Sequence, residues 1–522
     1  MRKKPELPPG PSVSGALRRY LYFSAATTGA AIMIIEILGA KMLAPFFGTS
    51  HFVWTAQIAV TLVALATGYY AGGRLVDNAP KLGRLYACVL IAAIYLGFTI
   101  VVVEPVAYWC LKYKLAVGSL IAASFLFFIP LALLAMVGPF VVRVLTDSVA
   151  EVGGTIGRLT AISTLGSVIG TVLIGYVLVP FFPNSVTMYL TAGFLMALVA
   201  GYFLLWETRK GSTPAATAGI AVGLLLGYGG TTKERLIHTD TTDELYRANS
   251  NFGLLQVLDK KEGNERYYLN DYLVQNIYDP TQKKSRALFT YALHQLAQAY
   301  TPRIERALCI GLGVGIVPMQ FAQEGVQVDV VEINPGVVAV ATNHFHCNSR
   351  LFNLTIGDGR HFINEAKEKY DTIILDAFLG DSSPSHLMTT NAFGAMRRIL
   401  KEEGTLVVNS FGYFEAGRDF FSASLEKTLR SVFRAVRVHA SGNGNVFYVA
   451  SDRPELKTLR EPNFEEVHLA CRHSAKEAFS GIQTPDLTRG IVLTDDYNPI
   501  EFYDAATREE HRRRLALNMK SL

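Results

Sequence analysis

Long hydrophobic stretches dominate the first 230 positions of the chain and then stop. Six of them are long enough to cross the roughly 30 Å hydrocarbon core of a bilayer as helices; they lie at residues 20–45, 53–73, 85–103, 117–142, 159–180 and 185–206. A seventh stretch, at 215–230, is shorter and less apolar. Because further spans follow the first one, it is not a cleavable signal peptide. The pattern predicts an α-helical transmembrane bundle of six or seven spans within residues 1–232.

Basic residues separate the loops between these stretches into two sets. One set holds Arg18 and Arg19, Arg74, Lys81 and Arg84, Arg143 and Arg158, and Arg209 and Lys210. The loops at 46–52 and 181–184 hold no Lys or Arg, although the loop with Lys112 and Lys114 fits less well. Cytoplasmic loops are enriched in Lys and Arg, so the first set is expected on the cytoplasmic side of the cell inner membrane.

The segment at 215–230 decides on which side of the membrane the rest of the chain lies. A full seventh span would place the following residues outside if the N-terminus is inside. This short apolar stretch would rise only about 24 Å as a helix, less than the hydrocarbon core. We therefore expect a partial or interfacial helix there, and a cytoplasmic C-terminal region.

Two features inside the bundle each have two interpretations. Glu36 lies among Ile and Leu residues in the first stretch, and a carboxylate in hydrocarbon needs a partner or a role. It is either a structural carboxylate bonded within the bundle or part of a substrate path. The segment "GYYAGGRLVD" at 68–77 resembles a loop of major-facilitator carriers, but a tight cytoplasmic turn explains it equally well.

Beyond residue 240 the hydrophobic pattern changes to short runs. Residues 240–285 alternate β-type runs with turn residues such as "KKEGN", which predicts a small β-domain. Residues 286–505 alternate strand-like and helix-like segments, which predicts a doubly wound, mainly parallel Rossmann-like α/β domain. Residues 506–522 form a basic C-terminal tail. The expected fold is therefore multi-domain, with a helical membrane domain, a small β-domain and an α/β domain.

Glycines and acids follow successive predicted strands of the α/β domain. Gly311, Gly313 and Gly315 follow the strand at 307–311, and Glu332, Asp358 and Asp376 close the strands at 327–332, 352–357 and 371–376. Ligands of such sheets bind at the carboxyl ends of the strands, where glycines admit a cofactor and an acid accepts ribose hydroxyls. The third glycine comes one residue early for a dinucleotide fingerprint, with Ile316 in its place. The pattern predicts a nucleoside site.

Composition excludes two other kinds of site. The formal net charge is +5, and no basic stripe with interleaved aromatics is present, so nucleic acid is not an expected partner. The five cysteines show neither paired spacing nor a Cys/His ligand pattern, so we expect no disulfide framework and no metal.

The chain resembles a known family in its C-terminal half. Residues from Asn249 to about Ser451 are similar to the spermidine synthase family of polyamine aminopropyltransferases, in which a small β-domain leads into a methyltransferase-like Rossmann domain. The whole chain resembles bacterial members that are fused to a membrane domain. The resemblance rests on the motifs "LNDYLVQ", "GLGVGI", "VVEIN", "GDGRHFI" and "YDTIILDAFLGDSSPSHL".

This resemblance implies a role for individual residues. Asp376 takes the position of the catalytic aspartate. Donor binding falls to Gly311, Gly313, Gly315, Glu332, Asp358 and Gly359, and acceptor binding to Gln275, Tyr291, Asp376 and Asp381, with Tyr413 as a further wall. The implied donor is decarboxylated S-adenosylmethionine, a co-substrate that leaves as methylthioadenosine, with no tightly bound cofactor. A putrescine-like amine is the implied acceptor, the lipid bilayer is a partner, and a homodimer is a further expectation.

The chain departs from the family at three positions of the site. Val314 stands where soluble members have an Asp that contacts the ammonium of the donor. Phe289 replaces a Tyr in the helix before the first strand, and the second acid of the gatekeeping loop is displaced to Asp381. The segment "LTDDYNPIE" at 493–501 resembles a C-terminal motif of the fused proteins, in which Asp495 and Asp496 have no assigned role.

Three functions therefore remain open. The first is a membrane-anchored aminopropyltransferase, favoured by Asp376 and Gln275. The second is an S-adenosylmethionine-dependent methyltransferase on the same fold, which Val314 keeps open. The third is a transporter or sensor whose nucleoside-binding domain is regulatory, which Glu36 and the carrier-like loop keep open.

Overall fold

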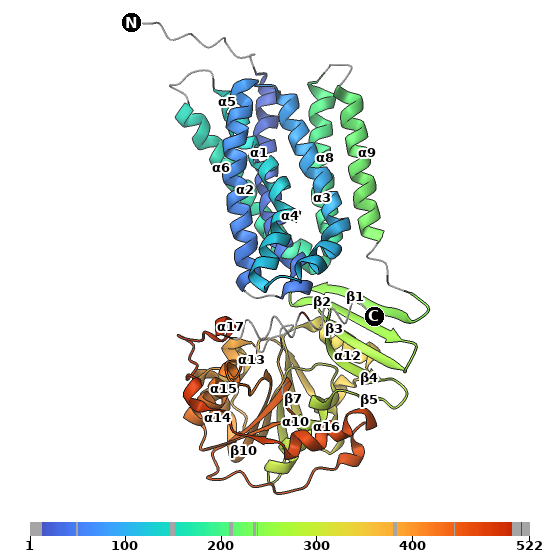
Figure 1. Cartoon of the computed structure of the whole chain (residues 1–522), viewed down its shortest axis with the longest axis vertical. Helices are drawn as coiled ribbons and strands as arrows, with labels where there is room; N and C mark the ends of the chain where they lie inside the picture. Colours follow the sequence, from blue (N-terminus) through green and yellow to red (C-terminus); the bar gives the residue numbers. More distant parts are fainter. Residues whose placement is uncertain are drawn as a thin grey trace. The chain divides into compact units, whose positions relative to one another are not determined.

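The chain divides into two compact units, Met1–Arg235 and Leu236–Leu522, which are described separately. The computed structural model describes residues 13–48, 51–146, 152–207, 212–232, 236, 238–378, 384–442, 444–503 and 513. The first unit is helical, and the second combines two β-sheets with helices (Figure 1). Asp381 lies outside the described residues.

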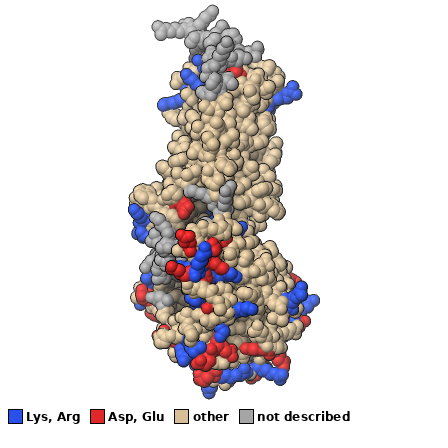
Figure 2. All heavy atoms as spheres, turned by 90° about the vertical axis from the view of Figure 1, so that its right-hand side faces the viewer, with Lys and Arg blue, Asp and Glu red and all other residues tan. Residues whose placement is uncertain are grey.

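The helical unit contains every hydrophobic stretch predicted from the sequence. Its elements are α1 (Gly15–Phe47), α2 (His51–Asn78), α3 (Leu82–Cys110), α4 (Leu115–Ala135), α5 (Val137–Leu145), α6 (Val152–Leu173), the π-helical turn η2 (Ile174–Leu178), α7 (Val179–Phe181), α8 (Asn184–Leu205) and α9 (Ser212–Thr231). Six helical segments of the described chain are long and apolar enough to cross a membrane, α4 with α5 and α6 with α7 each forming one. Figure 2 shows that Lys, Arg, Asp and Glu gather mainly on the other unit and at the ends of this one.

Small residues allow the long helices to pack closely. A Cβ atom added to Gly166 of α6 would lie 2.0 Å from the carbonyl oxygen of Ala26 in α1, and one added to Gly29 would lie 2.4 Å from that of Ser163. Such contacts tolerate no side chain, and they are typical of helices that pack in a bilayer without a hydrophobic driving force between them.

Helix α9 packs along the length of two neighbours. Gly219 lies beside Leu90 and Gly230 beside Ile100, so α9 runs parallel to α3. A Cβ atom added to Gly227 would lie 2.0 Å from Tyr189 of α8. The helix has 20 residues, not the 16 of the predicted segment, and spans about 30 Å at 1.5 Å per residue. Its apolar part, Thr217–Thr231, is shorter than the six candidate spans, so the expectation of a partial helix stays a prediction.

Glu36 has a polar neighbour on the adjacent helix. Its carboxylate lies at hydrogen-bond distance from the hydroxyl of Thr61 in α2, and that hydroxyl also lies 2.9 Å from the carbonyl oxygen of Gln57. The amide of Gln57 is fully buried, and its nitrogen has no hydrogen-bond partner among the described residues. Of the two interpretations of Glu36, this arrangement favours the structural carboxylate.

The second unit begins with a five-stranded antiparallel meander. Its strands are β1 (Thr242–Ser250), β2 (Gly253–Lys260), β3 (Glu265–Asn270), β4 (Leu273–Asp279) and β5 (Lys284–Ser285), and each pairs with the next. Asp271 and Tyr272 both have positive φ angles, 47° and 62°, as a two-residue hairpin turn requires. This turn joins β3 to β4.

An eight-stranded sheet forms the remainder, in the order β13-β11-β12-β10-β9-β6-β7-β8. Its strands are β6 (Arg306–Ile310), β7 (Gln327–Glu332), β8 (Asn353–Ile356), β9 (Tyr370–Leu375), β10 (Leu400–Gly412), β11 (Ala435–Ala440), β12 (Gly444–Ser451) and β13 (Ile482–Gln483). Strands β6 to β10 pair in parallel, whereas β11, β12 and β13 are antiparallel. The predicted parallel core is thus present, with an antiparallel edge.

Helices cover both faces of this sheet. One core contains residues of α10 (Leu288–Tyr300), α11 (Ile316–Gln323), α12 (Pro335–His344) and α16 (Leu469–Ser480), and the other contains residues of α13 (Gly359–Glu365), α14 (Thr390–Ile399) and α15 (Phe420–Val432). Strand β9 is buried at every position for this reason. Consequently only the strand ends are left to form a site.

Candidate functional site

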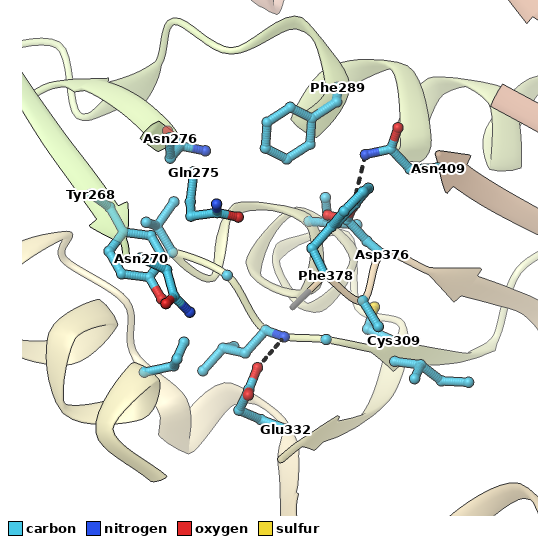
Figure 3. Close-up of a pocket in the computed structure, with 18 of the residues that line it drawn as sticks. Tyr268, Asn270, Gln275, Asn276, Phe289, Cys309, Glu332, Asp376, Phe378 and Asn409 are labelled. Carbon is cyan, nitrogen blue, oxygen red and sulfur yellow. Dashed lines mark hydrogen bonds between the residues drawn. The ribbon is translucent and has the colours of Figure 1, made fainter. Parts of the chain in front are cut away.

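A cavity of about 650 Å³ opens at the carboxyl ends of the parallel strands (Figure 3). The glycine loop, Glu332, the Asp358–Gly359 turn and Asp376 line it from the large sheet. Gln275 of β4 and residues of β3 line it from the small sheet. The structure therefore brings Glu332, Asp358 and Asp376 into one cavity with the predicted glycines except Gly315, which is not part of its lining.

The glycine loop between β6 and α11 has room for backbone only. Gly311 has a φ of +98°, and a Cβ atom there would lie 2.2 Å from the carbonyl oxygen of Asp376. Gly315 has a φ of +83°, and its Cβ would lie 2.3 Å from the sulfur of Cys347. Gly313, by contrast, faces open space within 4 Å and lines the cavity. Two of the glycines thus shape the loop, and the third leaves room for a ligand.

Glu332 closes β7 and holds the glycine loop. One carboxylate oxygen accepts the backbone N–H of Leu312 at 3.0 Å, and the other accepts that of Asn334 at 2.8 Å. Burial raises the pKa of Glu332, while these backbone hydrogen bonds oppose the shift. A carboxylate has about four acceptor sites, so Glu332 retains capacity for a ribose hydroxyl beside its backbone hydrogen bonds.

Asp358 caps α13 at the edge of the cavity. Its carboxylate accepts the backbone N–H of His361 at 2.9 Å and lies 3.1 Å from Nε2 of His386. Burial favours a higher pKa for Asp358, but the hydrogen bonds from His361 and His386 outweigh it and lower the pKa. A Cβ atom on Gly359 would lie 2.6 Å from Ile310, so the turn packs directly on β6.

Asp376 follows β9 and lies near the opposite wall of the cavity. Its carboxylate accepts the side-chain amide of Asn409 at 2.8 Å, as Figure 3 shows. Burial raises the pKa of Asp376 to about 6, although the hydrogen bond from Asn409 acts in the other direction. A carboxyl with this pKa is mostly ionised at neutral pH and can still take up a proton during a reaction.

Aromatic rings form much of the remaining wall. Phe289 and Phe378 face the cavity in Figure 3, and Phe378 lies 5.3 Å from the ring of Phe411. Gln275 and Tyr268 lie on the side of the small sheet. Aromatic faces attract cations and stack on nucleobases, so these rings suit a cationic substrate.

Some predicted residues do not lie in the cavity. The hydroxyl of Tyr291 donates to the carbonyl of Ser285 at 2.7 Å, and its ring packs in a small core with Cys471. Tyr413 does not line the cavity and instead carries the guanidinium of Arg418 over its ring. The structure thus places Phe289 rather than Tyr291 at the cavity, because α10 turns Tyr291 inward.

Asp495 in the C-terminal motif supports the segment that carries His386. Its carboxylate accepts hydrogen bonds from Nη2 of Arg360 at 2.8 Å and from the hydroxyl of Thr389 at 2.6 Å. Arg360 also donates to the carbonyl of His386 at 2.9 Å. The motif thus braces the side of the cavity at Asp358, a structural role that the sequence left open.

Asn409, Asn445 and His386 line the cavity but were not predicted. Asn409 lies near the end of β10, the strand beside β9, so inspection of every strand end would have found it. His386 and Asn445 approach the cavity from a loop and from the antiparallel edge, for which the sequence gives no comparable rule. Among the described residues, no group of three or more His, Cys, Asp or Glu side chains is placed to hold a metal.

Comparison with known proteins identifies this region. Residues 288–441 match the family model described as spermine/spermidine synthase domain. These residues are similar to that domain family. The matched region includes α10, the glycine loop, Glu332, Asp358, Asp376 and Asn409, whereas Gln275 precedes it and Asn445 follows it.

Three curated relatives differ in how much of the chain they match. A polyamine aminopropyltransferase from Vibrio vulnificus is 33% identical over 190 residues, which is 35% of this chain and 62% of the relative. An N-terminal histidine N-methyltransferase from Emericella nidulans is 26% identical over 55% of this chain and 59% of the relative. Polyamine aminopropyltransferase 2 from Aquifex aeolicus is 23% identical over 81% of this chain and 84% of the relative.

The extent of these matches has two consequences. The chain spans about three fifths of the length of the first two relatives. The match to the Aquifex aeolicus protein covers more residues than the second unit contains, so it includes part of the helical unit. One of the three relatives therefore matches residues of both units.

Proposed function

We propose that the second unit is an aminopropyltransferase that transfers an aminopropyl group from decarboxylated S-adenosylmethionine to a di- or polyamine. One observation carries this proposal: the carboxylate of Asp376 lines the same cavity as the ribose-side acid Glu332 and the Asp358–Gly359 turn. A nucleoside held by Glu332 and Asp358 leaves Asp376 for the reacting amine. The relatives named polyamine aminopropyltransferase support the same reaction.

The reaction is a substitution at carbon and conserves all atoms. The lone pair of a neutral amine attacks the carbon next to the sulfonium, the new N–C bond forms, and the C–S bond breaks. The electron pair of that bond passes to sulfur, which leaves as the thioether of methylthioadenosine. The product nitrogen carries one excess proton, which must leave.

Asp376 suits both charge states of the acceptor. As a carboxylate it attracts the ammonium of the incoming amine, and with a pKa of about 6 it can accept the proton that makes that amine nucleophilic. The rings of Phe289, Phe378 and Phe411 replace part of the water that a cation loses on entry.

A methyltransferase is the second candidate, and Val314 favours it. This side chain is 3% exposed and lines the cavity, where it offers no charge to the lone ammonium of a decarboxylated donor. The N-methyltransferase relative from Emericella nidulans is a further reason to test it. Purified protein should be incubated with each sulfonium donor and a panel of diamines, followed by mass spectrometry of the products. Methyl transfer without aminopropyl transfer would replace the first candidate by the second.

We also propose that the helical unit spans a membrane, with α9 as a seventh span. The helix has 20 residues, and its glycines from Gly219 to Gly230 pack against α3 and α8, which supports a full crossing. Since α9 runs parallel to α3, it ends on the side opposite the basic loop that holds Arg74, Lys81 and Arg84. By the positive-inside tendency, the second unit then lies outside the cytoplasm.

This topology is the alternative to the cytoplasmic placement expected from the sequence, which assumed a partial helix at 215–230. It would make the enzyme dependent on donor and amine present outside the cytoplasm. Paired reporter fusions after Tyr246 test it, one active only in the cytoplasm and one active only outside. Activity of the cytoplasmic reporter alone would restore the original expectation without affecting the proposed reaction.

A further inference from the structure

Two asparagine side chains form a chain of hydrogen bonds that ends on Asp376. The amide nitrogen of Asn409 donates to Oδ1 of Asp376 at 2.8 Å, and the amide oxygen of Asn409 accepts Nδ2 of Asn445 at 3.1 Å. Asn409 is 1% exposed, whereas Asn445 is half-buried. These hydrogen bonds therefore link the half-buried Asn445, through the buried amide of Asn409, to the carboxylate of Asp376.

The register of the sheet creates this arrangement. Strands β10 and β12 pair antiparallel, with Asn409 opposite Phe447 and Phe411 opposite Asn445. Asn409 and Asn445 are thus diagonal neighbours on one face, within reach of each other's side chains. On the other side of β10, the parallel pairing of Val408 with Leu375 places Asn409 beside Asp376.

The direction of the two hydrogen bonds fixes the orientation of Asn409. A side-chain amide has a donor end and an acceptor end, and only the donor end is favourable toward a carboxylate. Asn445 supplies a donor to the acceptor end, so a flipped Asn409 would lose both hydrogen bonds and place two oxygens against each other. Buried polar groups without partners are costly, which strengthens this preference.

We infer that Asn409 and Asn445 are positioning residues for Asp376, with Asn409 holding the carboxylate and Asn445 holding the orientation of Asn409. This inference deepens the proposed function and rests on it, since it assumes that Asp376 handles the reacting amine. Neither asparagine has to touch the reacting atoms in this account.

A positioning role has a consequence for protonation that a merely structural role lacks. The hydrogen bond from Asn409 favours the ionised form of Asp376 and so lowers its pKa, against burial, which raises it to about 6. Loss of this bond should raise the pKa of Asp376 further. Activity that needs the carboxylate would then fall at neutral pH and recover at higher pH. The other titratable groups that line the same cavity among the described residues are Lys260, Tyr267, Tyr268, Cys309, Glu332, Asp358 and His386.

The test compares wild type with the variants Asn409→Leu, Asn445→Leu and Asn445→Ala. The pKa of Asp376 is read from an infrared pH titration of its carboxyl band, assigned by its loss in Asp376→Asn. The acid limb of kcat for aminopropyl transfer is the functional readout. In Asn409→Leu, the ratio of kcat at pH 6 to kcat at pH 8.5 should be about tenfold lower than in wild type, because a hydrogen bond to a charged group is lost. The Asn445 variants should shift the same limb in the same direction by a smaller factor.

Asn276→Ala is the matched control, since Asn276 lines the cavity from β4 and bonds Ser285 rather than Asp376. Its acid limb and Asp376 titration should match wild type. An unmoved Asp376 titration in Asn409→Leu and Asn445→Ala, with wild-type methylthioadenosine binding, would overturn the inference. If Asn409→Leu does not fold, the partly exposed Asn445 still decides it. If wild type transfers no aminopropyl group, the proposed function fails, and the infrared titration still decides whether the asparagines position Asp376.

Discussion

The two units of the molecule use polar side chains for different purposes. In the helical unit, several hydroxyls bond to carbonyls one turn earlier in their own helix, as Thr28 does to Ser24 and Thr191 to Thr187, and others join neighbouring helices, as Ser24 does to Tyr86. In the second unit, carboxylates and amides bond across elements at a cavity, as Glu332 does to the glycine loop and Asn409 to Asp376. The bonds of the helical unit support helix packing, whereas those at the cavity hold charges there. The comparison assigns the chemistry to the second unit and a packing role to the polar groups of the first.

The largest effect is expected from Asp376→Asn, which keeps the shape of the side chain and removes its charge. Turnover should fall by about 10²-fold or more, the usual scale for a positioned acid–base group. Methylthioadenosine affinity should stay within about twofold, since ribose contacts are assigned to Glu332. Steady-state kinetics and calorimetry measure the two quantities. Near-normal turnover at saturating amine would remove Asp376 from the mechanism.

The next effect is expected from Glu332→Ala. The substitution removes the acceptor for ribose hydroxyls and also leaves the N–H groups of Leu312 and Asn334 without their partner. Affinity for methylthioadenosine should fall by about 10- to 100-fold, as expected for hydrogen bonds to a charged group. Glu332→Gln is the matched control, because it keeps one acceptor oxygen and should lose less affinity. Unchanged affinity in the Ala variant, measured by calorimetry on folded protein, would make Glu332 a loop brace only.

A smaller effect should follow from Val314→Asp, which restores the acid that the family resemblance leads one to expect. The new carboxylate can bond the lone ammonium of the decarboxylated donor and repels the carboxylate of S-adenosylmethionine. Preference for the decarboxylated donor should rise by about tenfold, the strength of one charge-assisted hydrogen bond. Competition between the two donors for the purified protein measures it. A preference that moves toward S-adenosylmethionine would contradict this placement of the aminopropyl arm.

The smallest effect is expected from Glu36→Gln, the same acid-to-amide change made in the helical unit. Glu36 lies at hydrogen-bond distance from Thr61, and an amide can keep that contact. Aminopropyl transfer by the full-length protein should stay within about twofold of wild type, because no step of the reaction involves this carboxylate. A loss of turnover comparable to that of Asp376→Asn would give the helical unit a part in the reaction and end the division of roles.

The sequence predicted elements best where the hydrophobic pattern was long or strongly periodic. The six apolar stretches and the parallel strands β6, β7 and β9 belong to this group. Helix α13 has only seven residues and depends on Asp358 as its cap, so its pattern was too short to recognise. Helix α9 begins at Ser212, before the predicted segment, because its first residues are polar and leave the hydrophobic pattern unchanged.

The site was predictable to the extent that parallel strands end at one edge. This rule placed Glu332, Asp358 and Asp376 together, and the structure has all three in one cavity. It could not tell which of Phe289 and Tyr291 faces the cavity. Residues two apart on a helix point in different directions, and only the tertiary packing decides which of them faces the site. Asn445 lies on the antiparallel strand β12, and the register of its pairing with β10 brings it to the site. A local sequence pattern does not reveal which strands pair or in which register.

The central claim is that the cavity transfers an aminopropyl group, and product analysis tests it most directly. Purified full-length protein would be incubated with equal amounts of decarboxylated S-adenosylmethionine and S-adenosylmethionine and with a panel of diamines. The products would be identified by mass spectrometry. The account predicts amines that gain an aminopropyl group, release of methylthioadenosine, and loss of both products in Asp376→Asn. Amines that gain only a methyl group, with S-adenosylhomocysteine released, would contradict it.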